Sequence, residues 1–462
     1  MSRMIRPGRL PCRKPLQLHA MKKIFCCLAL LLTGCRAFAQ APLRLTLAEA
    51  LHLAQENRLE LKTQAMQVQL AEAANDKLRA RWMPQVSAGA DLRWNTQLQT
   101  NVLPVGAFGI PGVPADATRT VQFGSPFSHA LSLQVEQKIV DFNRQLDRKI
   151  NANALESQQN NLVQRQIDVR YDVTEAYYAA LFQQERMHLA QLAVDRAQAN
   201  LAVGQVRLRD GVLLPDDLDR LALDSSNTRL TYISARRDWL QSLETLRYRL
   251  QLPDDVTLEL ADGLDQLRQA NATQPASHAL ERPEVRAERL AEQLDDLNRQ
   301  KERMRNRPTL SAYGNYTLLQ LHDTPNFFAA GSWFPYSYLG IRLTVPVYDG
   351  KQARLAARDY TWRQEIDCLN AEKREADFEF ETDKYHNAIQ QADLELQIAR
   401  QNMVLATQIL RTDQLRFREG VILPTALKDS EYACQQAESN YLSAVYNWLM
   451  ANLNWKRASG NL

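Results

Sequence analysis

The chain has 462 residues, a formal net charge of +3, and charged residues at 24% of its positions. This nearly balanced charge gives no support for a nucleic-acid-binding protein. Mean hydropathy is negative, and Gly and Pro are scarce, at 16 and 18 residues. The composition is typical of a helix-rich protein and excludes a helical membrane protein.

The N-terminal segment is predicted to be a secretory signal. Residues 1–20 hold several basic residues and no acidic one, and Met21-Lys22-Lys23, the expected start, leads into the apolar run Ile24–Leu32. That run is too short for a membrane span, which takes about 20 residues, and its basic flank is typical of a signal peptide. Two processing sites compete: cleavage after Ala37-Phe38-Ala39, and a lipoprotein box, Leu32-Thr33-Gly34-Cys35, that would acylate Cys35.

Cysteine and histidine spacing indicates neither a disulfide nor a metal site. In a hairpin that turns at Gly420, Cys368 and Cys434 would lie roughly 57 Å apart along the axis, too far for a disulfide. No CxxC or HExxH spacing occurs in the sequence, and no nucleophile–base set or phosphate-binding loop is found. We therefore expect no enzyme activity, no cofactor and no metal.

The chain contains an internal repeat. QVRLRDGVLLPDDL at residues 205–218 matches QLRFREGVILPTAL at residues 414–427 at eight of fourteen positions. Further upstream, WMPQVSAGADLRW matches NRPTLSAYGNYTL, and VDFNRQ matches VYDGKQ. The two proline-containing segments are 224 residues apart, whereas VDFNRQ and VYDGKQ are 208 apart when their aspartates are aligned. The first copy therefore has 16 extra residues between its two strand-like segments. They fall in residues 101–127, a Gly- and Pro-rich interval that we expect to be a long loop.

Each copy is predicted to contain two strands, because apolar and polar residues alternate. Strands of about ten residues with one apolar face and aromatic residues near their ends suit a transmembrane barrel, although a soluble sandwich is an alternative. Four strands cannot close a barrel, and open edges are not stable in hydrocarbon, so strands from several chains must join. The predicted strands are residues 84–95, 128–140, 308–319 and 337–348.

Two proline-free segments are predicted to form very long helices. Asn143–Arg209, with Gly204 as its one glycine, would be about 100 Å long, and Lys351–Glu419 is similar. Apolar and charged residues surround both helices, so each needs helical neighbours on two sides, as in a coiled-coil wall. Gly211 and Gly420, each followed four residues later by proline, mark sharp reversals. The repeated stretch is therefore the tip of a long helical hairpin, made once in each copy.

This ordered pattern resembles the TolC-type outer-membrane efflux and secretion channels, also called outer membrane factors, over essentially the whole mature chain. The resemblance rests on LTLAEALHLAQENRLEL at residues 45–61, the strand starts at Pro84 and Pro308, the strand-to-helix joints VDFNRQ and VYDGKQ, and the paired tips. No single motif is diagnostic, but the ordered set, repeated twice, is specific. The resemblance implies a mainly α fold with membrane β: a homotrimer with a twelve-stranded outer-membrane β-barrel, continued by a long periplasmic α-helical barrel.

The resemblance also implies a role. It is that of a passive exit duct of a tripartite efflux pump or a type I secretion system, in contact with outer-membrane lipid. Its partners would be a periplasmic adaptor (membrane fusion) protein and an inner-membrane RND or ABC transporter. The alternative is a structural coiled-coil protein of the periplasm or cell surface. The expected domains are 1–39, an N-terminal extension and signal peptide; 40–252, the first repeat with its tip at 204–217; 253–283, an equatorial connection; and 284–462, the second repeat with its tip at 413–426.

Two further expectations concern the processing of the signal segment, which is judged against the family pattern, and the long loop, which is inferred from the 16 extra residues of the first copy. Only ten residues separate Cys35 from Thr46, whereas family members with a clear lipoprotein box often have a longer segment there, so ordinary cleavage is favoured. Residues 101–127 are expected to form an extracellular loop longer than its counterpart around residues 320–335.

The candidate docking residues lie at the two tips, where glycine and small apolar side chains would let a partner helical hairpin approach closely. In the family pattern the closed tip is latched by a tyrosine three residues before the second tip glycine and an arginine two after it. Those positions are Phe417 and Ile422 here, while the tyrosine's aspartate partner is retained as Asp217. The alternative is that the tip residues are solvated helix ends. The docking candidates are Gly211, Val212, Leu214, Gly420, Val421 and Leu423.

The candidate gate residue is Asp429, roughly 13 Å above the second tip in a helix. In the family an aspartate at this position faces the lumen and forms a selectivity ring, and three like charges would repel unless cations bridge them. The matching position of the first copy is Arg220, so Asp429 could instead pair with an arginine of a neighbouring hairpin, or lie on a solvated outer face. Asp216 and Asp217, with Asp219, offer a second acidic ring nearer the mouth.

Overall fold

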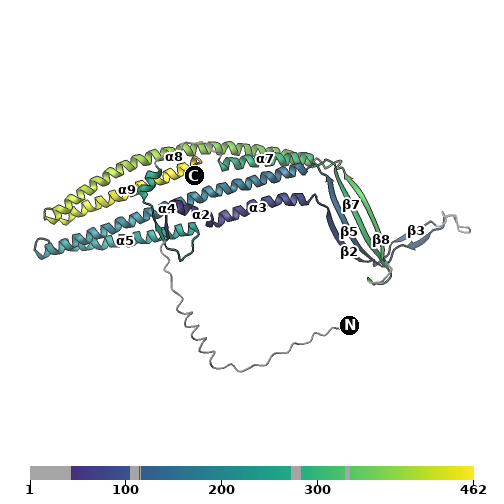
Figure 1. Ribbon diagram of the computed structural model, residues 1–462, viewed down its shortest axis with the longest axis horizontal. Helices are drawn as coiled ribbons and strands as arrows, with labels where there is room; N and C mark the ends of the chain where they lie inside the picture. The colour runs from purple at the N-terminus through teal and green to yellow at the C-terminus, as the bar shows by residue number, and fades with distance from the viewer. Residues whose placement is uncertain (1–42, 105–113, 115, 272–281, 328–332) are drawn as a thin grey trace, which may run out of the picture.

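The computed structural model describes residues 43–104, 114, 116–271, 282–327 and 333–462. The signal segment and Cys35 lie outside the described residues. The protein is elongated, with a small sheet at one end of a long helical body (Figure 1). Its elements in chain order are β1 (Leu43–Leu45), α2 (Leu47–Asn57), α3 (Leu59–Ala80), β2 (Gln85–Trp94), β3 (Thr100–Leu103), β4 (Arg119–Gln122), β5 (Phe127–Val140), α4 (Arg144–Arg209), α5 (Pro215–Leu250), β6 (Leu258–Leu260), α6 (Leu264–Asn271), α7 (Pro283–Met304), β7 (Thr309–His322), β8 (Trp333–Thr344), α8 (Gln352–Arg418) and α9 (Pro424–Ala458).

An antiparallel sheet of four strands, in the order β2-β5-β7-β8, forms the end opposite the helical tips (Figure 1). Its register puts Ala88 opposite Leu133, and Gly314 opposite both Val135 and Leu339. Side chains of alternating residues share a face, so these apolar residues cover one side of the sheet. Strands β2 and β8 are its edges, and no strand in the described part of the chain pairs with their outer sides.

Three features of the strand region differ from the prediction. Strand β7 continues to His322, three residues beyond its expected end. Strand β8 begins at Trp333 and ends at Thr344, four residues earlier than expected at each end. Pro335 lies inside it, because an edge strand tolerates the missing N–H of proline. The interval 101–127, expected to be a loop, contributes to a second small sheet in which β3 pairs antiparallel with β4.

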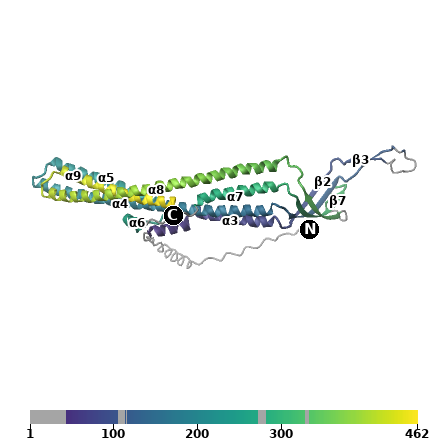
Figure 2. The same ribbon diagram turned by 90° about the horizontal axis from the view of Figure 1, so that it is seen from above.

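The long helices form two antiparallel hairpins, α4 with α5 and α8 with α9 (Figure 1). Helices α4 and α8 have 66 and 67 residues, about 100 Å each. In the half nearer the sheet, α3 packs against α4, and α7 packs against both α4 and α8. In the half nearer the tips, α4 packs against α5 and α9. This succession of neighbours along the helices (Figure 2) explains why no single apolar stripe follows either long helix.

The main apolar core lies midway along the molecule, where the short elements meet the long helices (Figure 2). Strand β1 pairs in parallel with β6, and the fully buried Tyr177 of α4 donates its hydroxyl to Leu45 O and to Asp262, both at 2.9 Å. Burial, together with the bond to Asp262, raises the pKa of Tyr177. The tyrosine therefore remains a neutral donor that ties the N-terminal strand to the connection between the two hairpins.

A single residue separates α2 from α3. Arg58 has φ −56° and ψ 118°, which is not helical, and its side chain is only 3% exposed. Its guanidinium group donates to Arg249 O and to Asp172, both at 3.3 Å. The arginine thus holds the break in the helix against α4 and α5.

Within the described residues, no helix has both the length and the apolar character needed to cross a membrane. Cys368 is exposed and Cys434 is buried, and both are free thiols.

Candidate functional site at the helical tips

The two hairpins turn through the same hydrogen-bonded motif. In the first, the N–H of Gly211 donates to Leu208 O at 3.1 Å and that of Val212 donates to Arg207 O at 2.9 Å. Gly211 has φ +71°, a left-handed conformation that glycine adopts without steric cost. Together these two bonds form a Schellman motif, in which a glycine satisfies the last carbonyls of a helix.

The second tip repeats the motif. The N–H of Gly420, with φ +78°, donates to Phe417 O at 3.0 Å, and that of Val421 donates to Arg416 O at 2.8 Å. A proline then occupies the first turn of the helix that follows each tip, where its missing N–H costs nothing. The local sequence therefore determines both reversals.

The predicted docking residues are exposed at these reversals. A Cβ added to Gly211 would meet no atom within 4 Å, and one added to Gly420 would meet only the guanidinium group of Arg207, at 3.3 Å. Between the exposed side chains of each turn, one side chain points inward: Leu213 is buried and Ile422 is half-buried. The docking candidates, all of them exposed, are Gly211, Val212, Leu214, Gly420, Val421 and Leu423.

Phe417 anchors the second tip to the first. Its side chain is 1% exposed and packs in an apolar cluster with Leu213 and Leu427. The guanidinium group of Arg207 lies 5.1 Å from the ring centroid and donates to Phe417 O at 3.2 Å. At the position of the family's latch tyrosine, this chain therefore places a buried aromatic ring under an arginine of the other hairpin.

Sequence reasoning did not identify Arg207, although a signal was present. Arg207 and Arg416 occupy matching positions of the repeated stretch. Their surroundings differ, because Arg207 crosses to the other hairpin, whereas Arg416 lies 3.4 Å from Asp413 of its own helix.

The acidic candidates are separated into paired and unpaired groups. Asp217 lies 3.5 Å from Arg220, one turn along α5, and so that arginine pairs within its own helix. Asp216 and Asp429 are exposed. The neighbour of Asp429, Lys428, reaches across to Asp224 of α5 at 3.2 Å.

A series of polar contacts joins α4 to α9 above the tip. Arg196 donates through both terminal nitrogens to Glu438, at 3.2 Å each, and Asn200 donates to the buried Glu431. Burial raises the pKa of Glu431 and also that of the Cys434 thiol. Sequence reasoning missed these residues because their roles depend on which helix faces which. Among the described residues, no group of His, Cys, Asp and Glu could hold a metal ion.

Comparison with known proteins identifies a matching family profile and solved structures with a similar fold. The profile of the outer membrane efflux protein family matches residues 50–250. No curated protein sequence matches the chain. Its fold is similar to that of CusC, described as forming a transmembrane channel, with a TM-score of 0.70, 14% identity, and coverage of 89% of this chain and 91% of that one.

Two further outer-membrane structures have similar folds. The CmeC outer membrane channel of Campylobacter jejuni matches with a TM-score of 0.68 and 13% identity, covering 90% of this chain and 85% of that one. The outer membrane protein VceC of Vibrio cholerae matches with a TM-score of 0.68 and 11% identity, covering 90% and 96%. Residues 50–250 thus match the outer membrane efflux protein family, and about nine-tenths of the chain shares the fold of these outer-membrane structures.

Proposed function

We propose that three copies of the chain assemble so that their four-stranded sheets close one twelve-stranded barrel, which the helices continue as a duct. The observation that carries the proposal is the sheet itself. The outer edges of its two edge strands, β2 and β8, pair with no strand in the described part of the chain. Because open strand edges are not stable in hydrocarbon, another copy has to cover them.

The geometry of the sheet supports closure between copies. Strand β2 leads away from the helices and β8 leads back toward them (Figure 1), so β8 of one copy and β2 of the next would run antiparallel. One face is apolar and exposed, as in Leu339, which is 91% exposed. The opposite face carries Gln134 and Arg342, which pair in register with neighbouring strands. In a barrel the apolar face would contact lipid and the polar face would line the lumen.

On this basis the chain is a passive exit duct in a tripartite efflux pump or a type I secretion system. The two tips are the docking surface for a periplasmic adaptor, which would link the duct to an inner-membrane RND or ABC transporter. Support comes from the paired Schellman turns, which present accessible glycine backbone and exposed apolar side chains at matching positions. Such a surface suits a partner helical hairpin that approaches closely.

The experiment compares two lysine substitutions at similar depth on opposite faces of the sheet. Leu339→Lys places a charge on the apolar face, which costs about 2–4 kcal/mol near the bilayer midplane. Gln134→Lys places the same charge on the polar face and is the control. We expect heat-modifiable trimers in outer-membrane fractions and ion-conducting channels in planar bilayers for the wild type and the control, and a marked loss of both for Leu339→Lys. Recovery of the wild type as a soluble periplasmic monomer, or equal effects of the two lysines, would overturn the proposal.

A further inference from the structure

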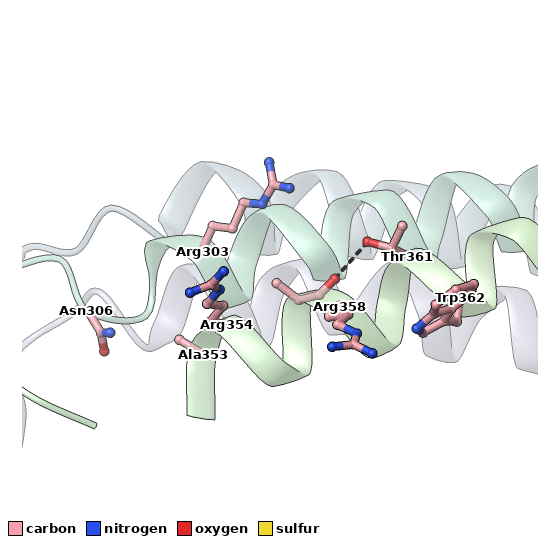
Figure 3. A pocket seen from close by; sticks show the side chains of 8 residues that line it. Arg303, Asn306, Ala353, Arg354, Arg358, Thr361 and Trp362 are labelled. Carbon is pink, nitrogen blue, oxygen red and sulfur yellow. Dashed lines mark hydrogen bonds between the residues drawn. The ribbon is translucent and has the colours of Figure 1, made fainter. Parts of the chain in front are cut away.

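A cavity of about 520 Å³ lies where the helices join the sheet, between the end of α7 and the start of α8. Figure 3 shows that Arg354, Arg358 and Trp362 follow one another along α8. Arg303 extends from α7, and Asn306 lies on the link to β7. The three arginine side chains and Trp362 are exposed, so the cavity is open to whatever surrounds this part of the molecule.

The cavity is strongly basic. In the described part of the chain, no carboxylate comes within 4.0 Å of Arg303, Arg354 or Arg358. The nearby Asp349 is engaged elsewhere, because it accepts from Asn306 at 3.0 Å and from the N–H of Ala353 at 3.0 Å. These bonds lower the pKa of Asp349, which remains a charged cap of α8. The three guanidinium groups are therefore free to bind an anion.

A second basic cavity, of about 400 Å³, lies between the end of α3 and the start of α4. It also combines three arginines with one tryptophan: Arg79, Arg144, Arg148 and Trp82. The guanidinium group of Arg144 stacks 4.4 Å from the centroid of Trp82. Of these three arginines, Arg79 alone lies within 4.0 Å of a carboxylate of the described residues, that of Asp76, at 3.4 Å. The two cavities thus have similar linings, contributed by different helices, at the junction between the helices and the sheet.

Both cavities lie at the depth of lipid headgroups if the sheet spans the membrane, and to that extent the inference rests on the proposed function. Strands β5 and β7 have 14 residues each. They would be about 46 Å long, or about 35 Å high at a tilt near 40°. The hydrocarbon core is about 30 Å thick. The residues just before β7 and just after β8 therefore fall in the periplasmic headgroup layer.

We propose that the two cavities bind the phosphate groups of phospholipids in the periplasmic leaflet. Arginine matches phosphate with two parallel N–H donors and is less strongly hydrated than lysine. Tryptophan prefers the membrane interface, where its ring is in apolar surroundings and its N–H remains in water. Each copy of the chain would hold one headgroup at each cavity, so that bound lipid surrounds the foot of the barrel.

Native mass spectrometry of the full-length trimer tests this proposal. The protein is incubated with phosphatidylglycerol or with diacylglycerol of the same acyl chains, which lacks the phosphate. We compare Arg303→Gln/Arg354→Gln/Arg358→Gln with Arg229→Gln/Arg236→Gln/Arg411→Gln, a control in which three exposed helical arginines away from both cavities are neutralised. The cavity variant is expected to retain about half as much phosphatidylglycerol as the wild type, since one of two arginine sites is removed. The control is expected to match the wild type.

Equal phosphatidylglycerol retention by the two variants would overturn the proposal, as would equal retention of phosphatidylglycerol and diacylglycerol by the wild type. Inorganic phosphate is added in a separate arm. If it binds the wild type while phosphatidylglycerol does not, the cavities take a soluble anion and the lipid assignment is wrong. The same spectra report assembly, so a wild type that forms no trimer would refute the proposed function, whereas trimers without selective lipid would refute only this inference.

Discussion

Truncation of Phe417 to alanine is expected to loosen the contact between the two hairpin tips. The ring is 1% exposed within an apolar cluster, and deleting a buried phenylalanine side chain costs about 3–5 kcal/mol. Loss of the Arg207 stacking adds about 0.5–1 kcal/mol. Even the lower limit, about 3 kcal/mol, corresponds to a roughly hundredfold shift in a local opening equilibrium.

Amide hydrogen exchange in the assembled protein measures this shift directly. Peptides covering residues 413–426 should exchange roughly a hundredfold faster in Phe417→Ala, up to the limit set by the local stability of the tip. Val421→Ala is the matched control, because Val421 is 71% exposed in the same turn and surface truncations usually change stability by less than about 0.5 kcal/mol. Unchanged exchange in Phe417→Ala, or equal acceleration in both variants, would refute the assignment of Phe417 as the anchor.

Four further outcomes are expected. Replacing Gly211 and Gly420 together by leucine forces leucine into two left-handed backbone conformations, at a cost of about 1–2 kcal/mol each. This double variant should lose transport while its trimers persist, and the corresponding double asparagine variant should lose less transport. Unchanged transport in the double leucine variant would contradict docking at the tips. Asp429→Ala should weaken cation preference and block by trivalent cations in single-channel recordings, and an unaltered reversal potential would count against a luminal aspartate. Burial raises the pKa of Glu431, so the stability that its protonated carboxyl contributes is full at low pH and is lost as pH rises from about 4.5 through the raised pKa. The melting temperature should fall over that pH range in the wild type but not in Glu431→Gln. An identical dependence of melting temperature on pH in the two proteins would exclude Glu431 as the cause. Protease added to intact cells should cut within residues 101–127, and cutting only after disruption of the outer membrane would show that this segment is not extracellular.

The long helices could be predicted closely because local chemistry determines where they end. The expected segments, 143–209 and 351–419, differ from α4 and α8 by at most one residue at each end. Proline-free stretches extend until a glycine ends each helix with a left-handed turn, and both features are visible in the sequence. Which helices pack together could not be predicted in this way, because polar and apolar residues surround both helices.

The strands were harder to delimit. Alternation continues beyond the end of β8 to Val347, yet pairing with β7 stops at Thr344, and hydrogen-bond partners rather than side-chain pattern set that limit. The pair β3 and β4 has four residues in each strand, too few for alternation to be distinguished from chance. At the tips, the glycines and their exposed neighbours followed from turn chemistry, whereas the link between Arg207 and Phe417 joins residues 210 apart and required the fold.

The tightly packed core midway along the molecule has a mechanical consequence. Helix α5, whose C-terminal end lies in this core, has 36 residues between the core and the tip, about 54 Å of stiff helix. A hairpin of that length acts as a lever whose fulcrum is the core around Tyr177. A tilt of about 5° there would carry the tip roughly 5 Å sideways, nearly the rise of one helical turn. In the proposed duct, substitutions that repack the fulcrum by a fraction of an ångström would therefore alter the width of the opening at the tips without changing any residue that lines it.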